Sequence, residues 1–110
     1  IAQGFPPDTI SSDQYNRHIG SNPQHGLCLT MSKLMAAGMN DVDALTRVTL
    51  RPAECLGLTD EIGSLTPGTC ADLAVLHWDD SVKSLEDVNG VERPGGCWEP
   101  VCTIRAGEVV

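Results

Sequence analysis

The stretch "IGSLTPGTCADLAVLHWDD", residues 62–80, is where the composition of the chain changes. It carries a Pro67-Gly68 pair, which is typical of a tight turn. Almost every residue from Leu73 to Trp78 is apolar, so both faces of this segment are apolar. An apolar run of this length, preceded by turn residues, predicts a buried strand.

The residues after this strand have the pattern of further β structure. The Asn89-Gly90 pair is a strong hairpin signal. The final segment "PVCTIRAGEVV", residues 100–110, alternates between apolar and polar residues. Gly107 predicts a tight turn before a last strand that begins at Val109. From about Leu65 onward, the sequence therefore predicts β structure.

The region before this turn has the spacing of short helices. A first apolar stripe at helical spacing is made of Leu27, Met31, Leu34 and Met35. Gly38 suits the C-cap of this helix, and Asn40 is a good N-cap for a second one. Pro52 fits the first turn of a third helix, which Gly57 would end. Residues 27–58 are therefore predicted to form two or three short helices.

The opening segment "PDTISSD", residues 7–13, has a different character. Pro7 marks a boundary, and the β-branched content of residues 9–12 predicts a short strand. The strand would end on a lone carboxylate, Asp13, before a polar loop over residues 14–26. Asp13 is either a cap for the next element or a chemically active group, and these residues alone leave both interpretations open.

The charge balance excludes several classes of partner. The 110-residue chain has fifteen acidic and seven basic residues, for a net charge of −8. This balance cannot supply the positive field that nucleic acid or an anionic membrane surface requires.

No apolar run approaches the ~18 residues of a membrane span, and no signal-peptide pattern opens the chain. We expect a cytoplasmic protein. Aromatic residues make up only 4% of the chain, which is few for an independent core of this size. This scarcity suggests that the chain is part of a larger protein.

The number and spacing of the cysteines do not fit a disulfide framework or a zinc site. Their number is odd, their spacings are wide, and no C-x-x-C occurs. We expect small, mostly buried, reduced thiols with no part in metal binding. The five are Cys28, Cys55, Cys70, Cys97 and Cys102.

Three stretches, in this order, resemble the C-terminal end of metal-dependent amidohydrolases, in the deacetylase and dihydroorotase-like branch. "PDTISSD" is similar to the eighth strand of the family's barrel. "TMSKLMAAGMNDVDALTRVTLRPAECLGL", residues 30–58, is similar to the last barrel helices. "IGSLTPGTCADLAVL", residues 62–76, is similar to the signature G-x-L-x-P-G-x-x-A-D-L-x-V, which leads into a β-sandwich. The resemblance covers residues 4 to about 78 well and the tail moderately.

The resemblance implies an α/β fold, the C-terminal part of a (β/α)₈ TIM barrel with part of a small β-sandwich. Residues 1–60 would be the end of the barrel domain, with strand eight and the following helices. Residues 61–110 would be the C-terminal part of the sandwich. As an isolated chain, the 110 residues would be α+β.

The resemblance also implies the chemistry, which is metal-dependent hydrolysis of a C–N bond in an amide or cyclic amide. Asp13 would ligate the metal and exchange a proton with the attacking water. The metal would be divalent, with zinc expected, in one or two copies. Most of its ligands would lie upstream of Ile1, because one carboxylate cannot hold a catalytic metal. The chain alone should therefore be inactive.

Other residues receive weaker assignments. The loop after the last strand lines the substrate mouth in barrels, which makes Tyr15, Arg17 and His18 candidate contacts for a small amide-type substrate. Histidines in such a position, His18 and His25 here, are more often exposed loop residues than ligands. Asp72 is expected to be structural, fixing the Pro67-Gly68 turn to the following strand. The sequence leaves open whether the protein forms a homo-oligomer.

Two alternatives remain. One is a non-catalytic relative, an amidohydrolase-like barrel that lost its ligands and serves as an interaction or assembly protein. The other is a self-standing acidic α+β module without a barrel, which would unfold cooperatively on its own. A partial barrel would instead expose apolar helix faces.

Overall fold

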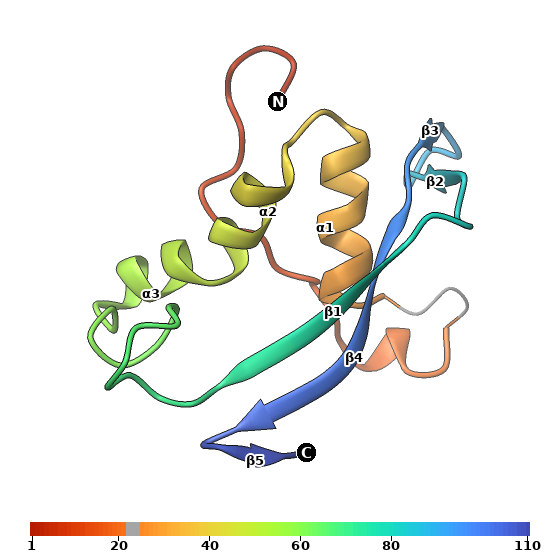
Figure 1. Cartoon of the computed structure of the whole chain (residues 1–110). Helices are drawn as coiled ribbons and strands as arrows, with labels where there is room; N and C mark the ends of the chain where they lie inside the picture. Colours follow the sequence, from red (N-terminus) through yellow and green to blue (C-terminus); the bar gives the residue numbers. More distant parts are fainter. Residues whose placement is uncertain (22–24) are drawn as a thin grey trace.

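The computed structural model describes residues 1–21 and 25–110. Helices come first along the chain and strands follow (Figure 1). The helices are the 3-10 helix η1 (Asn16–His18) and the α-helices α1 (Leu27–Ala36), α2 (Asp41–Val48) and α3 (Leu50–Leu56). The strands are β1 (Leu73–Asp79), β2 (Ser84–Glu86), β3 (Glu92–Pro94), β4 (Cys97–Arg105) and β5 (Glu108–Val109). The described residues are α+β with small sheets, and they form no closed barrel.

The strands form two antiparallel sheets, one with the order β1-β4-β5 and one made of β2 and β3. Helix α1 contacts both β4 and α2, and α2 in turn contacts α3. In Figure 1 the long β1–β4 pair crosses α1, while α3 lies at the far end of the helical part. Within the described residues, no helix is long and apolar enough to cross a membrane.

The helix boundaries confirm the local signals in the sequence. Gly38 follows the end of α1 at a φ of 107° and donates its N–H to Met35 O at 2.9 Å. The Asn40 side chain caps α2 by accepting from Asp43 N at 2.8 Å. Both devices satisfy backbone groups that a helix end leaves without a partner.

Helix α3 also ends as predicted, because Gly57 adopts the left-handed conformation at a φ of 69°. It begins at Leu50, two residues earlier than predicted, so Pro52 is its third residue. Proline is tolerated there because the first N–H groups of a helix have no partner within it.

The β1–β4 pair is held by cross-strand contacts. Trp78 lies opposite Trp98, and their ring centroids are 5.1 Å apart at an interplanar angle of 67°. Such edge-to-face pairs add to the stability of a sheet. The register shifts between Val75 and Leu76, next to Pro100. Proline lacks the N–H that a regular ladder needs, and a bulge accommodates it.

The strand predicted over residues 73–78 is confirmed as β1, but its predicted burial is wrong. Leu73 is 37% exposed and Val75 is 48% exposed. The apolar face exists, yet the described helices leave a groove in front of it. An apolar run indicates that a strand needs other residues packed against its faces. It does not show that those residues belong to the same stretch of chain.

The two predicted hairpins are present. Strands β2 and β3 are joined through Asn89-Gly90, where Gly90 has a φ of 78° and Asp87 N donates to Val91 O at 3.0 Å. The β4–β5 turn contains Ala106 and Gly107, both at positive φ. Strand β5 begins at Glu108, one residue earlier than predicted.

Asp72 is structural, but the predicted partner is wrong. Its Oδ1 accepts from Ala106 N at 2.8 Å, which ties it to the β4–β5 turn and not to the Pro67-Gly68 turn. The next turn residue, Gly107, donates to Ala71 O at 3.0 Å. Asp72 therefore anchors the far end of the sheet, where the backbone of Ala106 is held at a φ of 50°.

The strand predicted over residues 9–12 does not form. These residues have no regular secondary structure, and Ile10 N donates to Arg47 O, at the end of α2, at 3.0 Å. A strand requires a neighbouring strand for its ladder of hydrogen bonds. No described strand lies beside this segment, so its β propensity has no ladder to join.

The buried core is small. It centres on Ile10, Met39 and Ala44, with partly buried apolar residues packed against them, which are Ile1, Leu34, Met35 and Val48. The cysteines lie outside it, contrary to the prediction. Cys55 and Cys70 are exposed, and the other three are half-buried. Short helices bury only one stripe of residues, which leaves Cys55 of α3 on the open side.

One buried serine connects the helices to the sheet. Ser32, on α1, is 1% exposed, and its Oγ accepts from Trp98 N at 2.8 Å while donating to Cys28 O at 2.7 Å. The Trp98 ring adds a contact from Nε1 to Met35 Sδ at 3.3 Å. The first residues of β4 are thereby bound to α1.

Replacing Ser32 with alanine should destabilise the protein. The Ser32→Ala variant leaves the Trp98 N–H without its acceptor under the helix, which should lower the free energy of unfolding by about 1–3 kcal/mol. Urea denaturation measures this loss. The control is Ser84→Ala on the exposed edge of β2, expected within about 0.5 kcal/mol of the unmodified protein. Equal losses in both variants would contradict the role given to Ser32.

A glycine pair tests the approach of the 62–65 turn to α3. A Cβ on Gly63 would lie 2.7 Å from Ala53 Cβ and 2.9 Å from Thr49 O, whereas one on Gly68 would meet no atom within 4 Å. Both glycines have positive φ, 88° and 102°, so both alanine variants carry the same kind of backbone strain. Gly63→Ala should cost about 1–3 kcal/mol more than Gly68→Ala by thermal or urea unfolding. Similar values would show that the turn relaxes freely.

Candidate functional site

Asp13 lies at the end of the irregular segment, where the chain turns towards η1. Its φ is 50°, so it is one of two residues other than glycine with positive φ among those described. This left-handed region is sterically unfavourable for most side chains, and aspartate is one of the few that visit it. Asp13 is exposed, and no hydrogen bond or ion pair holds its carboxylate within the described part of the chain. Its oxygens are therefore free to accept a proton or ligate a cation.

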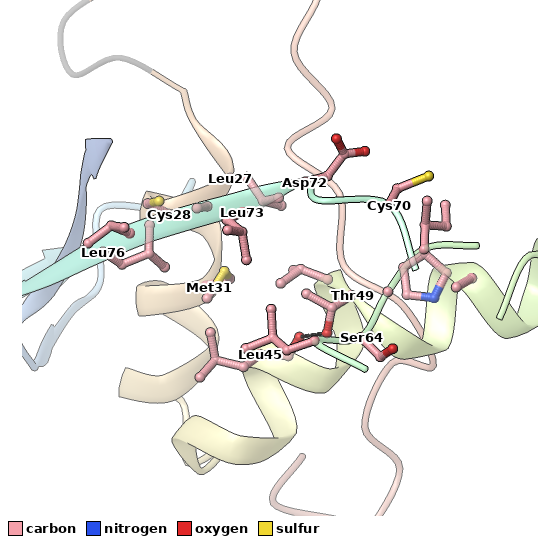
Figure 2. A pocket seen from close by; sticks show the side chains of 18 of the residues that line it. Leu27, Cys28, Met31, Leu45, Thr49, Ser64, Cys70, Asp72, Leu73 and Leu76 are labelled. Carbon is pink, nitrogen blue, oxygen red and sulfur yellow. Dashed lines mark hydrogen bonds between the residues drawn. The ribbon is translucent and has the colours of Figure 1, made fainter. Parts of the chain in front are cut away.

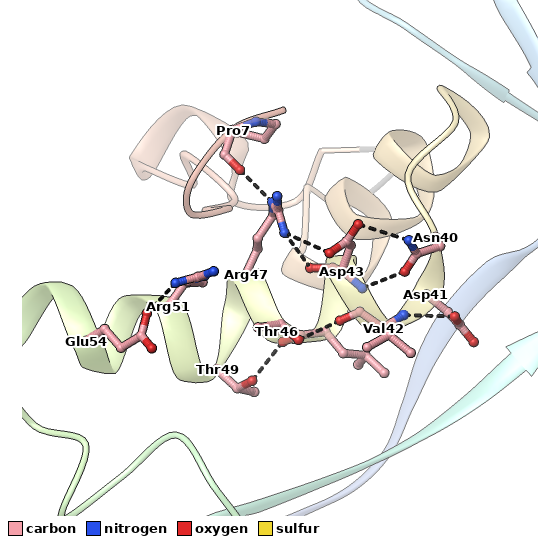
Figure 3. A network of polar contacts seen from close by, with 11 residues as sticks. Pro7, Asn40, Asp41, Val42, Asp43, Thr46, Arg47, Thr49, Arg51 and Glu54 are labelled. Carbon is pink, nitrogen blue, oxygen red and sulfur yellow. Dashed lines mark hydrogen bonds and ion pairs between the residues drawn. The ribbon is translucent and has the colours of Figure 1, made fainter. Parts of the chain in front are cut away.

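Helix α2 positions the segment that leads to Asp13 (Figure 3). Arg47 Nε donates to Pro7 O at 2.6 Å, and Arg47 O accepts from Ile10 N at 3.0 Å. A contact of 3.2 Å between Arg47 Nη1 and Asp43 Oδ1 orients the guanidinium. The side chain of Ile10 is buried in the core at 7% exposure. One arginine and one isoleucine thus place the backbone three residues before Asp13.

A cluster of three rings follows Asp13. The rings of Tyr15 and His18 have centroids 4.4 Å apart at 58°, and His18 is stacked on His25 at 4.4 Å and 28°. His18 Nδ1 is buried and has no hydrogen-bond partner in the described structure. The cluster places a polar atom of His18 inside, away from solvent.

The structure brings some of the predicted site residues together. Tyr15 and His18 are in contact, while Arg17 is exposed and shares the helix η1 with His18. Sequence reasoning missed His25 as a member of the cluster. Gly20, at a φ of 75°, is a local sign within the described residues that the chain turns after His18.

The described residues do not make a metal site by themselves. No group of three or more His, Cys, Asp or Glu side chains lies close enough to hold an ion in residues 1–21 and 25–110. Asp13 offers one free carboxylate, which suits a divalent cation as a single ligand. A catalytic zinc takes about three protein ligands. The donors present therefore fit one position of such a site.

A large apolar groove lies elsewhere on the molecule (Figure 2). Its volume is about 840 Å³, and its walls come from α1, α2, α3, the turn at residues 62–65 and β1. Leu45, Met31 and Leu73 lie around the same space in Figure 2. Asp13 is not part of the lining. The groove is therefore a separate surface from the candidate site.

The chain matches the amidohydrolase family over residues 2–110. The chain belongs to this family. The deacetylase of Enterococcus faecalis (strain ATCC 700802 / V583) is 33% identical over 110 residues, which are 99% of this chain and 30% of that protein. The adenine deaminase of Clostridium botulinum (strain Loch Maree / Type A3) is 29% identical over 77 residues, which are 70% of this chain and 11% of the deaminase.

Solved structures agree with this membership. An adenine deaminase crystal structure superimposes with a TM-score of 0.87 at 33% identity, covering 99% of this chain and 30% of the other. A dihydroorotase crystal structure gives a TM-score of 0.81 at 30% identity, covering 99% and 29%. This amidohydrolase chain thus spans about 30% of the relatives that it matches over its whole length. The resemblance to the C-terminal portion of the superfamily is confirmed.

Thiol reactivity tests the surroundings of the groove, which Cys28 lines. Burial, and secondly the nearby Cys97, raise the pKa of the Cys28 thiol. At pH 7 a raised pKa leaves less thiolate, so Cys28 should react with iodoacetamide several times more slowly than the exposed Cys55. Mass spectrometry of peptides measures both rates, and raising the pH should increase the Cys28 rate. Equal rates for Cys28 and Cys55 in the folded protein would show that the residues around Cys28 do not shield its thiol.

Proposed function

We propose that the intact protein is a metal-dependent hydrolase that cleaves a C–N bond in a small amide or cyclic amide. The observation that carries the proposal is Asp13, with its free, exposed carboxylate at a left-handed turn. It occupies the position at which the resemblance expects the metal-site aspartate. Membership of the amidohydrolase family and the names of the relatives, a deacetylase, adenine deaminases and a dihydroorotase, support hydrolysis of a C–N bond.

The same proposal divides the chain in two. Residues 1–60 are the end of a (β/α)₈ barrel, and residues 61–110 are the C-terminal part of a small β-sandwich. The helical part and the sheets of the structure meet near this boundary, which supports the division. The exposed apolar face of β1 and the groove before it are consistent with surfaces that a larger protein covers.

Asp13 has two roles in the proposed reaction. It would be one ligand of a divalent metal, zinc in this proposal, which when bound supplies an acidified water with a pKa of about 7. The carboxylate of Asp13 accepts a proton from the attacking water and passes it to the leaving nitrogen. The remaining ligands lie outside the described residues, so these 110 residues alone should be inactive.

Tyr15, Arg17 and His18 are the proposed substrate contacts. They follow Asp13 directly, and the loops after barrel strands form the mouth of the site in such enzymes. The contact between the Tyr15 and His18 rings supports a shared wall. The substrate is a small amide-type molecule, and the names of the relatives suggest a first panel of N-acetylated compounds, adenine and dihydroorotate.

The direct test combines metal analysis with this panel on the full-length protein. We expect stoichiometric divalent metal and turnover of at least one class of compound. Replacing all five cysteines with alanine or serine should leave the metal content unchanged. A protein without metal and without turnover would instead be the non-catalytic interaction protein, and the proposed function would be wrong.

The role of Asp13 is tested by Asp13→Asn in the full-length protein. Asparagine keeps the shape and one acceptor oxygen but cannot take up the proton. The turnover number should fall by about two to four orders of magnitude, the contribution of a positioned general acid or base, while most metal remains. The matched control is Asp8→Asn, an exposed carboxylate earlier in the same segment, which should keep turnover. Near-normal turnover of the Asp13→Asn variant would leave Asp13 as a turn residue only.

A further inference from the structure

His18, the last residue of η1, is held by several backbone hydrogen bonds and ring contacts. The backbone N–H of His18 donates to Tyr15 O at 2.8 Å. The backbone carbonyl of His18 accepts from Ser21 N at 3.1 Å and from Ser21 Oγ at 2.9 Å. Both backbone polar groups of His18 are thus engaged. The Tyr15 and His25 rings contact its imidazole, each at a centroid distance of 4.4 Å. The ring is held by its neighbours and by the backbone.

Held in this way, the imidazole keeps one buried nitrogen without a hydrogen bond within the described residues. Nδ1 is buried and has no hydrogen-bond partner in the structure as described. Buried polar atoms nearly always have a partner, so an unpaired one points to a group that is still to arrive.

This atom lies close to the proposed reaction centre along the chain. Asp13 precedes Tyr15 by two residues, which limits their Cα separation to about 7 Å. A small molecule held at the Asp13 carboxylate therefore lies near the wall that Tyr15 and His18 form.

We propose that His18 Nδ1 forms a hydrogen bond with a polar group of the amide-type substrate beside the cleaved bond. His25 is the positioning residue that holds the His18 ring. This inference rests on the proposed function and assigns the recognition step to one atom. His25 is stacked on the ring of His18, and the proposal gives it no substrate contact of its own.

The experiment measures KM, kcat and metal content of the full-length enzyme on the panel compound that it hydrolyses best. His18→Phe keeps a flat ring between Tyr15 and His25 but removes Nδ1, and KM should rise about tenfold or more. Its metal content should not change, and kcat should change much less than KM. His18→Asn places a polar atom near the position of Nδ1 and should recover a large part of the KM effect.

The positioning role is tested by two substitutions of His25. His25→Ala removes the stacked ring and should raise KM, whereas His25→Phe retains a ring and should raise it less. His77→Phe is the matched control, because His77 is an exposed histidine on β1 outside the cluster. It should leave KM unchanged.

The outcomes separate this inference from the proposed function. If the unmodified enzyme turns over no panel compound, both are overturned. If it is active and His18→Phe has an unchanged KM, the inference is wrong while the proposed function stands. If His18→Phe and His18→Asn raise KM equally, Nδ1 is not the recognising atom, and the ring cluster is only structural.

Discussion

The hydrogen bond from Trp98 N to Ser32 Oγ, 2.8 Å long, is the contact on which the arrangement of the two parts depends. It places the backbone N–H of Trp98 against Ser32, which is 1% exposed, where water cannot replace the hydrogen bond. The Trp98 ring then reaches Met35 on the same helix and Trp78 on the neighbouring strand. Helix α1 in turn carries α2. The sheet and the segment that α2 holds are therefore connected through a single helix.

The candidate site depends on the other end of this connection. Arg47, near the end of α2, makes two hydrogen bonds to the backbone of this segment. Its Nε donates to Pro7 O, and its carbonyl accepts from Ile10 N. The burial of Ile10 prevents this segment from moving away. Asp13 then needs no contact of its own to be placed, and its carboxylate stays free. A rigid approach and an unpaired carboxylate are the combination that a metal ligand or proton carrier requires.

Local signals in the sequence predicted most of the regular elements, because each signal acts over a few residues. Asn40 caps α2 through Asp43 N, three residues away, and Gly57 ends α3 by adopting a conformation that few other residues tolerate. The strand expected over residues 9–12 failed for the opposite reason, since a strand depends on a neighbour that the local pattern cannot supply. The exposed face of Leu73 and Val75 has the same cause, an absent cover.

The sequence by itself determined the order of the helices and strands from residue 27 onward, the turn residues and the likeness to the amidohydrolase family, because propensities and motifs are local properties. It also singled out Asp13 as a candidate. Only the tertiary structure decided that Asp72 serves the β4–β5 turn, that Ser32 binds the sheet, and that His25 stacks on His18. These contacts join residues that do not belong to the same helix or strand. They arise when the packing of apolar faces fixes the path of the chain, and only then do particular polar atoms come within reach of one another.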